Sequence, residues 1–257
     1  MREINIEPNR SVERAIQILN CFHFERPALS IEDIVDKTGL PKATAYRLLW
    51  TMERNGLVHY DPREGLYRLG YKIMEYGGIV LANLDIRRES EHDLIELHEK
   101  TGLTVILAVP QGDMIQYLAR LDSDDYFQPR NYVGRRRVLH NGALGIAMLA
   151  HMDPAFVDDL LSRHPLEPLT PYTVTDPGEF KLLLETIRKD GHYVDKDGTF
   201  VGFTAIAVPI LNGKGEAVAA VGLSGATHKV TGEQQDHYIG LLKETASRIA
   251  QKLGLHT

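Results

Sequence analysis

Residues 30–69 read as a helix, a short turn, a second helix and a two-stranded hairpin. Ser30 can cap the first helix, and Gly39 ends it. Pro41 then stands where a proline can open the second helix. The turn at residues 61–65 joins two short β-rich runs. This order predicts a winged helix-turn-helix, a fold whose second helix fits the major groove of DNA.

The predicted second helix carries small, basic and hydroxyl-bearing side chains near its start, which would allow close approach to phosphates and base edges. A further arginine stands at the hairpin tip, where a wing would meet the DNA backbone. We therefore expect the DNA-contacting residues to be Lys42, Ala43, Thr44, Tyr46, Arg47 and Arg63. Two other interpretations stay open: an ordinary α+β corner, and a winged helix that binds proteins.

Charge is distributed unevenly along the chain. Residues 1–72 hold 11 basic and 10 acidic side chains, whereas residues 73–257 hold 18 and 25, which gives the net charge of −6. DNA affinity depends on local basic contacts, so an acidic second part does not exclude a DNA partner. The weak positive balance of the first part predicts modest affinity per subunit and hence a need for dimers.

The composition is that of an ordinary globular protein, with 43% hydrophobic and 25% charged residues. No apolar run approaches the roughly 20 residues of a membrane span, and residues 1–10 lack an apolar signal core. These features predict a cytoplasmic protein with no membrane partner. The single Cys21 excludes an internal disulfide and a cysteine-based zinc site.

Residues 85–257 mix hairpins and helices, which predicts an α+β domain with an antiparallel sheet flanked by helices. The expected strands are residues 104–109, 114–121, 203–210 and 217–224, with an extended stretch at 126–133. Helices are expected at residues 11–24, 70–83, 85–101 and 143–151, with others starting at Pro154, ending at Gly191 and capped by Thr231.

We find no convincing active site, metal site or cofactor motif, and expect none. Residues 222–226 nearly match a nucleophile elbow, but Ala226 replaces its last glycine. His92 and His98 are six residues apart, so they do not form an i, i+4 metal pair. Residues 135–137 are three consecutive arginines, which fit an anion-binding or salt-bridged role and an exposed surface strand equally well.

Residues 141–143 suggest a small-molecule site, because they open a predicted helix whose free N–H groups attract carboxylates. Ser224 ends a buried strand and is followed by Gly225, so it offers a hydrogen bond and leaves room. Such a concave site with few polar anchors is typical of ligand pockets.

Several motifs, in order along nearly the whole chain, resemble the IclR-type transcriptional regulators. They are residues 10–15 (RSVERA), 40–49 (LPKATAYRLL), 67–70 (YRLG), 134–136 (GRR), 139–140 (LH) with 143–145 (ALG), 207–210 (AVPI) and 223–225 (LSG). Each motif is weak alone, and the set is specific.

The resemblance implies a winged helix-turn-helix at residues 1–70, a linker helix at 71–84 and a GAF-like effector-binding domain at 85–257. It also implies homodimers, often paired into tetramers, that control operons for small-molecule catabolism. By matching position it places Lys42, Thr44 and Arg47 on the DNA-facing helix. The effector residues it implies are Asn141, Gly142, Ala143, Asp195 or Asp197, Ala205 and Ser224.

The chain departs from the family pattern on the DNA-facing helix and at positions where a ligand would bind. Ala43 replaces a serine, Asn141 and Gly142 replace alanine-threonine, Ile146 replaces a lysine and Ala205 replaces a frequent cysteine. The smaller side chains predict a carboxylate or aromatic effector bulkier than a two- or three-carbon acid. Two rival hypotheses are a constitutive DNA-binding protein whose large domain only oligomerises, and a small-molecule enzyme with a winged-helix interaction module.

Overall fold

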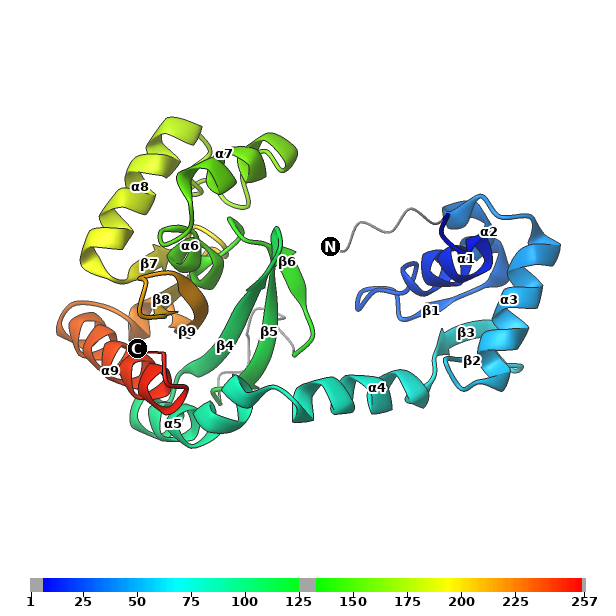
Figure 1. Ribbon diagram of the computed structural model, residues 1–257, viewed down its shortest axis with the longest axis horizontal. Helices are drawn as coiled ribbons and strands as arrows, with labels where there is room; N and C mark the ends of the chain where they lie inside the picture. Colours follow the sequence, from blue (N-terminus) through cyan, green and yellow to red (C-terminus); the bar gives the residue numbers. More distant parts are fainter. Residues whose placement is uncertain (1–6, 125–132, 256–257) are drawn as a thin grey trace. The chain divides into compact units, whose positions relative to one another are not determined.

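The computed structural model describes residues 7–124 and 133–255. The chain divides into two compact units, Met1–Asn83 and Leu84–Thr257, and each has its own hydrophobic core (Figure 1). The predicted α+β fold class, with a helix-turn-helix followed by a helix-and-sheet domain, is confirmed. Among the described residues, no helix has both the length and the apolarity that crossing a membrane requires.

The first unit is a winged helix followed by one long helix. Its elements are α1 (Arg10–Leu19), β1 (Ala28–Leu29), α2 (Ile31–Thr38), α3 (Lys42–Arg54), β2 (Val58–Asp61), β3 (Leu66–Leu69) and α4 (Tyr71–Ala82). The strands form an antiparallel sheet in the order β1-β3-β2, of which the short β1 was not predicted.

Local capping explains where α2 and α3 begin and end. The Ser30 hydroxyl accepts from the Asp33 backbone N–H at 3.1 Å, and Asp33 Oδ2 accepts from the Ser30 N–H at 3.0 Å. Gly39 ends α2 with φ +66°, a left-handed conformation that glycine adopts without strain. Pro41 lies at the N-cap of α3 rather than inside its first turn. The turn between the helices is therefore fixed by short-range interactions.

Helix α1 differs from its prediction in length and in burial. It ends at Leu19 rather than at residue 24, because the chain turns at Asn20 and continues toward β1. Ile18 is fully buried, whereas Val12 and Ile16, which share the apolar spacing of this helix, are 55% and 49% exposed. The helix therefore keeps an apolar face that no described residue of the first unit covers.

The second unit is one six-stranded antiparallel sheet between two layers of helices. The elements are α5 (Asp85–Thr101), β4 (Thr104–Gln111), β5 (Met114–Leu121), β6 (Arg136–Val138), α6 (Ala143–Leu149), α7 (Pro154–Arg163), α8 (Pro177–Asp190), β7 (Tyr193–Lys196), β8 (Phe203–Leu211), β9 (Ala217–Ala226), the 3₁₀ turn η1 (Thr227–Lys229) and α9 (Glu233–Lys252). The strand order is β6-β5-β4-β9-β8-β7.

Alternate residues of the central strands point to opposite faces of this sheet. On β4, Ile106 packs toward α6, α7 and α8, and Leu107 packs toward α5 and α9 (Figure 1). Helix α6 lies very close to the sheet at Gly222 of β9. A Cβ at this position would lie only 3.2 Å from the Leu144 side chain of α6. This face of the sheet, at the start of α6, holds the cavity described below.

Several sequence predictions for this unit are wrong in detail. The short strands β6 and β7 were not predicted as strands of the sheet, since each has few residues and pairs at a sheet edge. Gly232, not Thr231, occupies the N-cap of α9, which has no side-chain cap. The extended stretch expected at residues 126–133 lies, except for Val133, outside the described residues.

Candidate DNA-binding surface and ligand cavity

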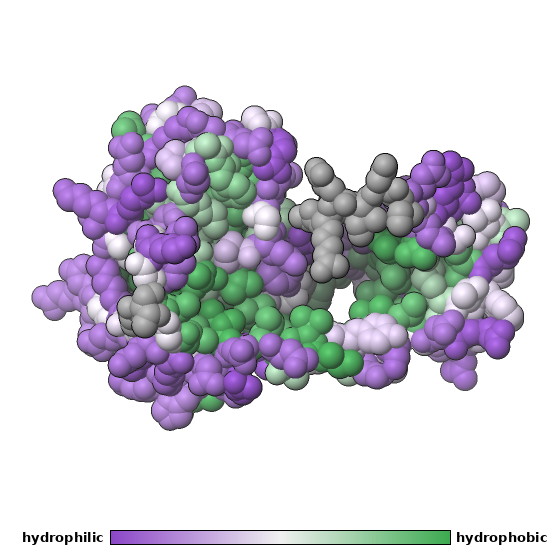
Figure 2. Space-filling model, viewed as in Figure 1, coloured by the Kyte–Doolittle hydropathy of each residue, from purple (hydrophilic) through white to green (hydrophobic). Residues whose placement is uncertain are grey.

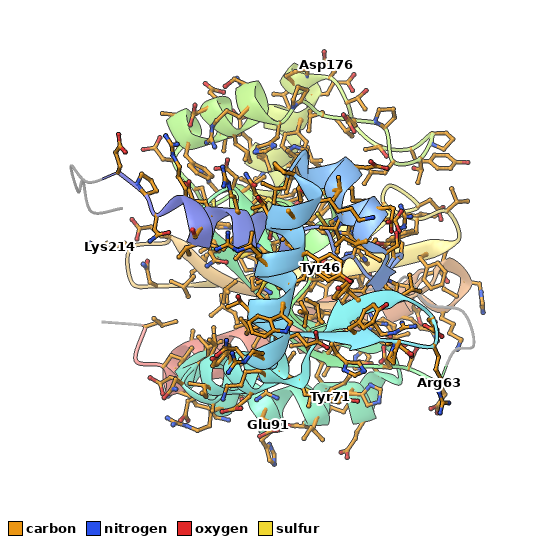
Figure 3. All side chains as sticks on the ribbon, turned by 90° about the vertical axis from the view of Figure 1, so that its right-hand side faces the viewer. Tyr46, Arg63, Tyr71, Glu91, Asp176 and Lys214 are labelled. Atoms are coloured by element: carbon orange, nitrogen blue, oxygen red, sulfur yellow. The ribbon has the colours of Figure 1, made fainter. Side chains whose placement is uncertain are left out.

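Helix α3 has one face in the core and one face in solvent. Ala45, Leu49 and Met52 are buried, which fixes the helix against α1 and α2. The predicted DNA-contacting residues Lys42, Ala43, Tyr46 and Arg47 are exposed, and Thr44 is partly exposed. Figure 3 shows Tyr46 on α3 and Arg63 at the tip of the β2–β3 hairpin.

The basic side chains of this surface differ in their partners. Lys42 Nζ lies 2.7 Å from Glu32 Oε1 on α2, and this hydrogen bond raises the pKa of Lys42. Within the described residues, the Arg47 and Arg63 side chains have no ion-pair partner, and both are exposed. Two fixed positive charges, one on the helix and one on the hairpin, are thus available to an anionic partner.

Tyr46 connects the exposed helix face to the hairpin. Its side chain neighbours Tyr67 on β3, whose pKa is raised to about 12 by burial and by this neighbour. The rings of Tyr67 and Tyr60 pack in a tilted arrangement with centroids 4.8 Å apart. Tyr46 is 51% exposed, so it can contact a partner while it holds α3 against the wing.

Sequence reasoning missed two aromatic and basic residues on this face. Trp50 is 57% exposed, and the Arg54 guanidinium carbon lies 4.9 Å from its ring centroid, a cation–π geometry. Trp50 follows Tyr46 by four residues and Arg47 by three, so all three share one side of the helix. A tryptophan at this spacing on a polar face was the available signal.

A cavity of about 50 Å³, partly open to solvent, lies between the start of α6 and the sheet. It brings together five of the seven predicted effector residues: Gly142, Ala143, Asp195, Ala205 and Ser224. Strand pairing explains this, because Asp195 pairs with Ala205 and Ala205 pairs with Ser224, across β7, β8 and β9. Apolar side chains line most of the remaining wall.

The other two predicted residues lie elsewhere. Asn141 lines an adjoining cavity of about 30 Å³, which shares Gly142, Asp195 and Thr199 with the first. Asp197 lines neither cavity: its Oδ1 accepts from the Gly202 N–H at 2.7 Å and from the Thr227 hydroxyl at 3.1 Å. Its φ of +62° places it in the turn that follows β7. Of the two aspartates left open by the sequence, Asp195 is the one in the cavity.

Arg137 from β6 enters this cavity and was missed as a single residue. Its guanidinium lies 5.8 Å from the Phe200 ring centroid, and Tyr117 lines the same cavity. Burial lowers its pKa, although an arginine of this kind stays charged at neutral pH. The signal was the arginine run at residues 135–137, which did not reveal which side chain points inward.

Gly142 faces Arg137 across the cavity. A Cβ built on Gly142 would lie 3.7 Å from Arg137 Nη1 and 3.7 Å from Thr199 Oγ1. Its φ of +112° is rarely adopted by residues with a side chain. The glycine therefore both permits the backbone turn into α6 and leaves open the space beside the guanidinium.

Asp195 supplies the opposite charge in the same cavity. It is buried, accepts a hydrogen bond from the Thr199 hydroxyl, and has a pKa raised by that burial, partly offset by hydrogen bonds from Thr199 and Gly198 and by the charge of Arg137. The cavity thus combines one permanent cation with one carboxyl group that can be neutralised by a proton.

Comparison with known proteins agrees with this geometry. Residues 78–251 match the family described as bacterial transcriptional regulator IclR C-terminal, and residues 11–62 match the IclR helix-turn-helix domain. The chain is 30% identical over 245 residues to the HTH-type transcriptional regulator XynR of Escherichia coli, covering 95% of this chain and 97% of that one. It is 28% identical to KdgR of Dickeya chrysanthemi, covering 96% and 80%.

Solved structures show the same likeness. An IclR transcriptional regulator from Alicyclobacillus acidocaldarius superposes with a TM-score of 0.84 at 25% identity, covering 96% of this chain and 99% of that one. An IclR homolog from Microbacterium hydrocarbonoxydans, complexed with 4-hydroxybenzoate, gives a TM-score of 0.83 at 26% identity, covering 95% and 99%. The chain belongs to the IclR family of helix-turn-helix transcriptional regulators. It is therefore a DNA-binding regulator and not an enzyme.

Proposed function

We propose that this regulator binds operator DNA through α3 and the β2–β3 wing, and that a small organic acid in the cavity of the second unit controls this binding. In this proposal residues 1–70 read DNA, residues 71–84 link, and residues 85–257 sense the ligand. The regulator acts in the cytoplasm on an operon for small-molecule catabolism. Regulators of this family such as KdgR and XynR support the regulatory class.

The observation that carries the ligand proposal is Arg137 in the cavity. A half-buried guanidinium beside the open backbone of Gly142 can bind a carboxylate with two charge-assisted hydrogen bonds. Ser224 adds a hydroxyl on the opposite strand. Because the Phe200 ring and Tyr117 already contact the guanidinium, it needs little reordering when a ligand arrives.

The cavity lining supports a ligand with an apolar body. Ala205 and Gly142 contribute little volume, and Phe203 and Ile106 line the same space. An aromatic acid fits this description, and one relative in the family has been crystallised with 4-hydroxybenzoate. An aliphatic acid longer than three carbons also satisfies the same anchors.

The DNA interface is proposed from exposure and charge. Arg47 is placed to read a base or phosphate from α3, and Arg63 to meet the backbone from the wing. Lys42 would exchange its pairing with Glu32 for a phosphate. Trp50 and Arg54 extend this surface along α3 and would lie against the backbone beside the groove.

Assembly as a homodimer or a dimer of dimers is proposed from uncovered apolar surface. Helix α4 exposes Met74, Ile79 and Val80, and Figure 2 shows hydrophobic surface along this helix. Val12 and Ile16 add an uncovered face on α1. Such surface is costly in water and marks contact sites, and two-fold pairing would match a near-palindromic operator.

A thermal-shift screen of organic acids and aromatic catabolites tests the ligand proposal most broadly. A compound that binds the folded protein at 100 times its Kd should stabilise it by about 2.7 kcal/mol and raise the melting temperature. The proposal requires that the same compound change operator affinity. Failure of every carboxylate to stabilise the protein, together with stabilisation by neutral compounds, would overturn it.

A further inference from the structure

His140 is a buried histidine that precedes the cavity residue Asn141. It is 7% exposed, and both of its ring nitrogens have partners. Nδ1 lies 3.0 Å from Oδ1 of Asn141, and Nε2 lies 2.9 Å from the backbone carbonyl oxygen of His164. Asn141, on the other side of this contact, lines the smaller cavity.

These two contacts constrain where the ring carries its protons. The His164 carbonyl can only accept, so Nε2 must carry a hydrogen. An amide oxygen beside Nδ1 would require a second ring proton and hence a charged imidazolium. Burial lowers the pKa of His140, and the nearby His164 lowers it further, although the hydrogen bonds to His164 and Asn141 act in the opposite direction. Since both ring partners are uncharged groups, the neutral ring is favoured.

A neutral ring leaves a lone pair on Nδ1, which needs a donor. The Asn141 amide supplies one if it turns by 180° about its last side-chain bond, a change that leaves its shape the same. Its NH₂ group then donates to His140, and its oxygen points away from the ring. We propose that His140 is a positioning residue that holds Asn141 with its carbonyl oxygen toward the smaller cavity, so that this end selects ligands bearing a hydroxyl or amide N–H.

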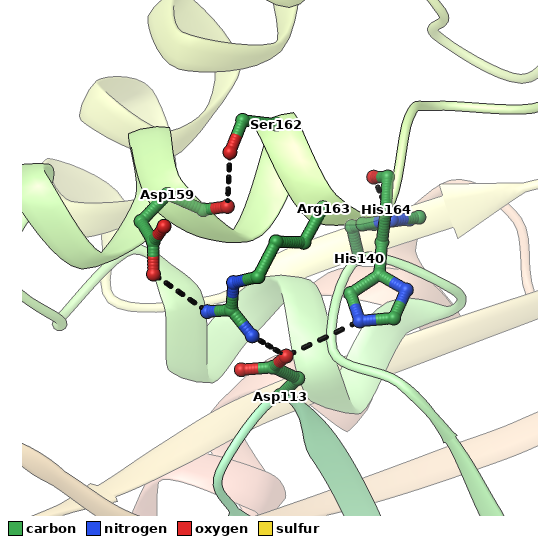
Figure 4. A network of polar contacts seen from close by, with 6 residues as sticks. All are labelled: Asp113, His140, Asp159, Ser162, Arg163 and His164. Atoms are coloured by element: carbon green, nitrogen blue, oxygen red, sulfur yellow. Dashed lines mark hydrogen bonds and ion pairs between the residues drawn. The ribbon is translucent and has the colours of Figure 1, made fainter.

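The group that fixes the His140 tautomer is itself held by an ionic network (Figure 4). The His164 backbone N–H donates to Leu160 at 2.8 Å at the end of α7. The His164 ring Nε2 lies 3.2 Å from Asp113 Oδ2. Arg163 also pairs with Asp113 and donates to Asp159 Oδ2 at 2.7 Å. This network anchors the carbonyl that receives the His140 N–H.

The surrounding charges do not remove the need for a donor at Nδ1. The titratable groups around His140 are His164, whose carbonyl it contacts, Asp113 and Arg163 in the network beyond, and Glu167 and Asp195 in the cavity wall. Among the described residues, none of their carboxylates hydrogen-bonds with the His140 ring. The hydrogen-bond partners of the His140 ring therefore decide which end of the Asn141 side-chain amide faces the ring.

This inference rests on the proposed ligand cavity and narrows its ligand class. The cavities of Arg137 and Asn141 adjoin, since they share Gly142, Asp195 and Thr199, and in this proposal one molecule extends across both. Its carboxylate would face Arg137, and its hydrogen-bond donor would face the Asn141 oxygen. The ligand class is then a hydroxy acid, or an amide-bearing acid, with the two groups at opposite ends.

The first test needs no ligand. In full-length protein labelled with ¹⁵N-histidine, the His140 signals are assigned by their loss in His140→Gln, or by their displacement in Asn141→Asp if the glutamine variant fails to fold. At pH 7 we expect a proton on Nε2 and a lone pair on Nδ1. A proton on Nδ1, alone or together with Nε2, would overturn the proposal.

The second test compares two probes, 4-hydroxybenzoate and 4-methoxybenzoate, by calorimetry. The hydroxyl can donate to Asn141 and the methoxy group cannot, so the native protein should prefer the former by about tenfold. His140→Gln keeps a donor for the His164 carbonyl but frees Asn141 to turn, and should abolish the preference. Equal weakening of both probes in this variant would show a structural role only and overturn the proposal. If neither probe binds, the proposal of an aromatic acid as ligand fails. The tautomer measurement then still tests the positioning role of His140.

Discussion

Replacement of Arg137 by glutamine tests the ligand site with the largest expected effect. The side chain keeps a polar amide but is two bonds shorter, and it loses the charge and the two-pronged contact with a carboxylate. Hydrogen bonds to charged groups contribute about 1.5–3 kcal/mol, which corresponds to a loss of roughly 10- to 150-fold in affinity for a carboxylate. The guanidinium lines a cavity and is not fully exposed to solvent. The smaller free energy that solvent-exposed ion pairs contribute therefore does not apply here.

The assay is calorimetric titration with the acid that gives the largest thermal shift. Arg136→Gln is the matched control, because it is an exposed neighbour on the same strand that does not line either cavity. Without ligand, Arg137→Gln should melt at or slightly above the native temperature, since burial of the charge is unfavourable. Equal affinity in the native and Arg137→Gln proteins, or an equal loss in Arg136→Gln, would refute the reasoning.

Three further predictions concern pH, DNA and assembly. A ligand carboxylate should raise the already raised pKa of Asp195, so ligand binding takes up a proton and weakens as pH rises through that pKa. Ligand affinity measured at several pH values should show this dependence in the native protein and not in Asp195→Asn. Arg47→Ala should weaken specific operator binding by about 1–3 kcal/mol. Lys42→Ala should weaken specific and non-specific binding alike and lower the slope of log affinity against log salt concentration by about one. Unchanged affinity in both variants would show that Arg47 and Lys42 lie outside the DNA interface. Light scattering at micromolar concentration should show at least a dimer, and Ile16→Glu should weaken it; a monomeric native protein that still binds its operator would contradict this.

The winged helix was predictable because short-range interactions define it. The Ser30 cap, the Gly39 stop and the turn at residues 61–65 act within a few residues of each other. The burial of Ala45 and Leu49 follows from helical periodicity. The exposure of Val12 and Ile16 was not predictable, since their helix shows the same apolar spacing whether this chain or another molecule covers it.

The cavity was predictable in part. Asp195 and Asp197 are two residues apart, and strand alternation would give them the same side. The strand ends before Asp197, whose positive φ turns it toward Gly202 and Thr227. Arg137 was hidden for another reason, because β6 is a three-residue strand whose pairing with β5 depends on a long-range contact.

The most direct test of the central claim is a titration of labelled operator DNA, measured by fluorescence anisotropy, with and without the acid found by the screen. The account predicts that the acid changes the operator affinity of the native protein by about 5- to 150-fold. Arg137→Gln should bind the operator as the native protein does and need roughly 10- to 150-fold more acid for the same response. An acid that occupies the cavity yet leaves operator affinity unchanged would contradict the account and favour a constitutive DNA-binding protein.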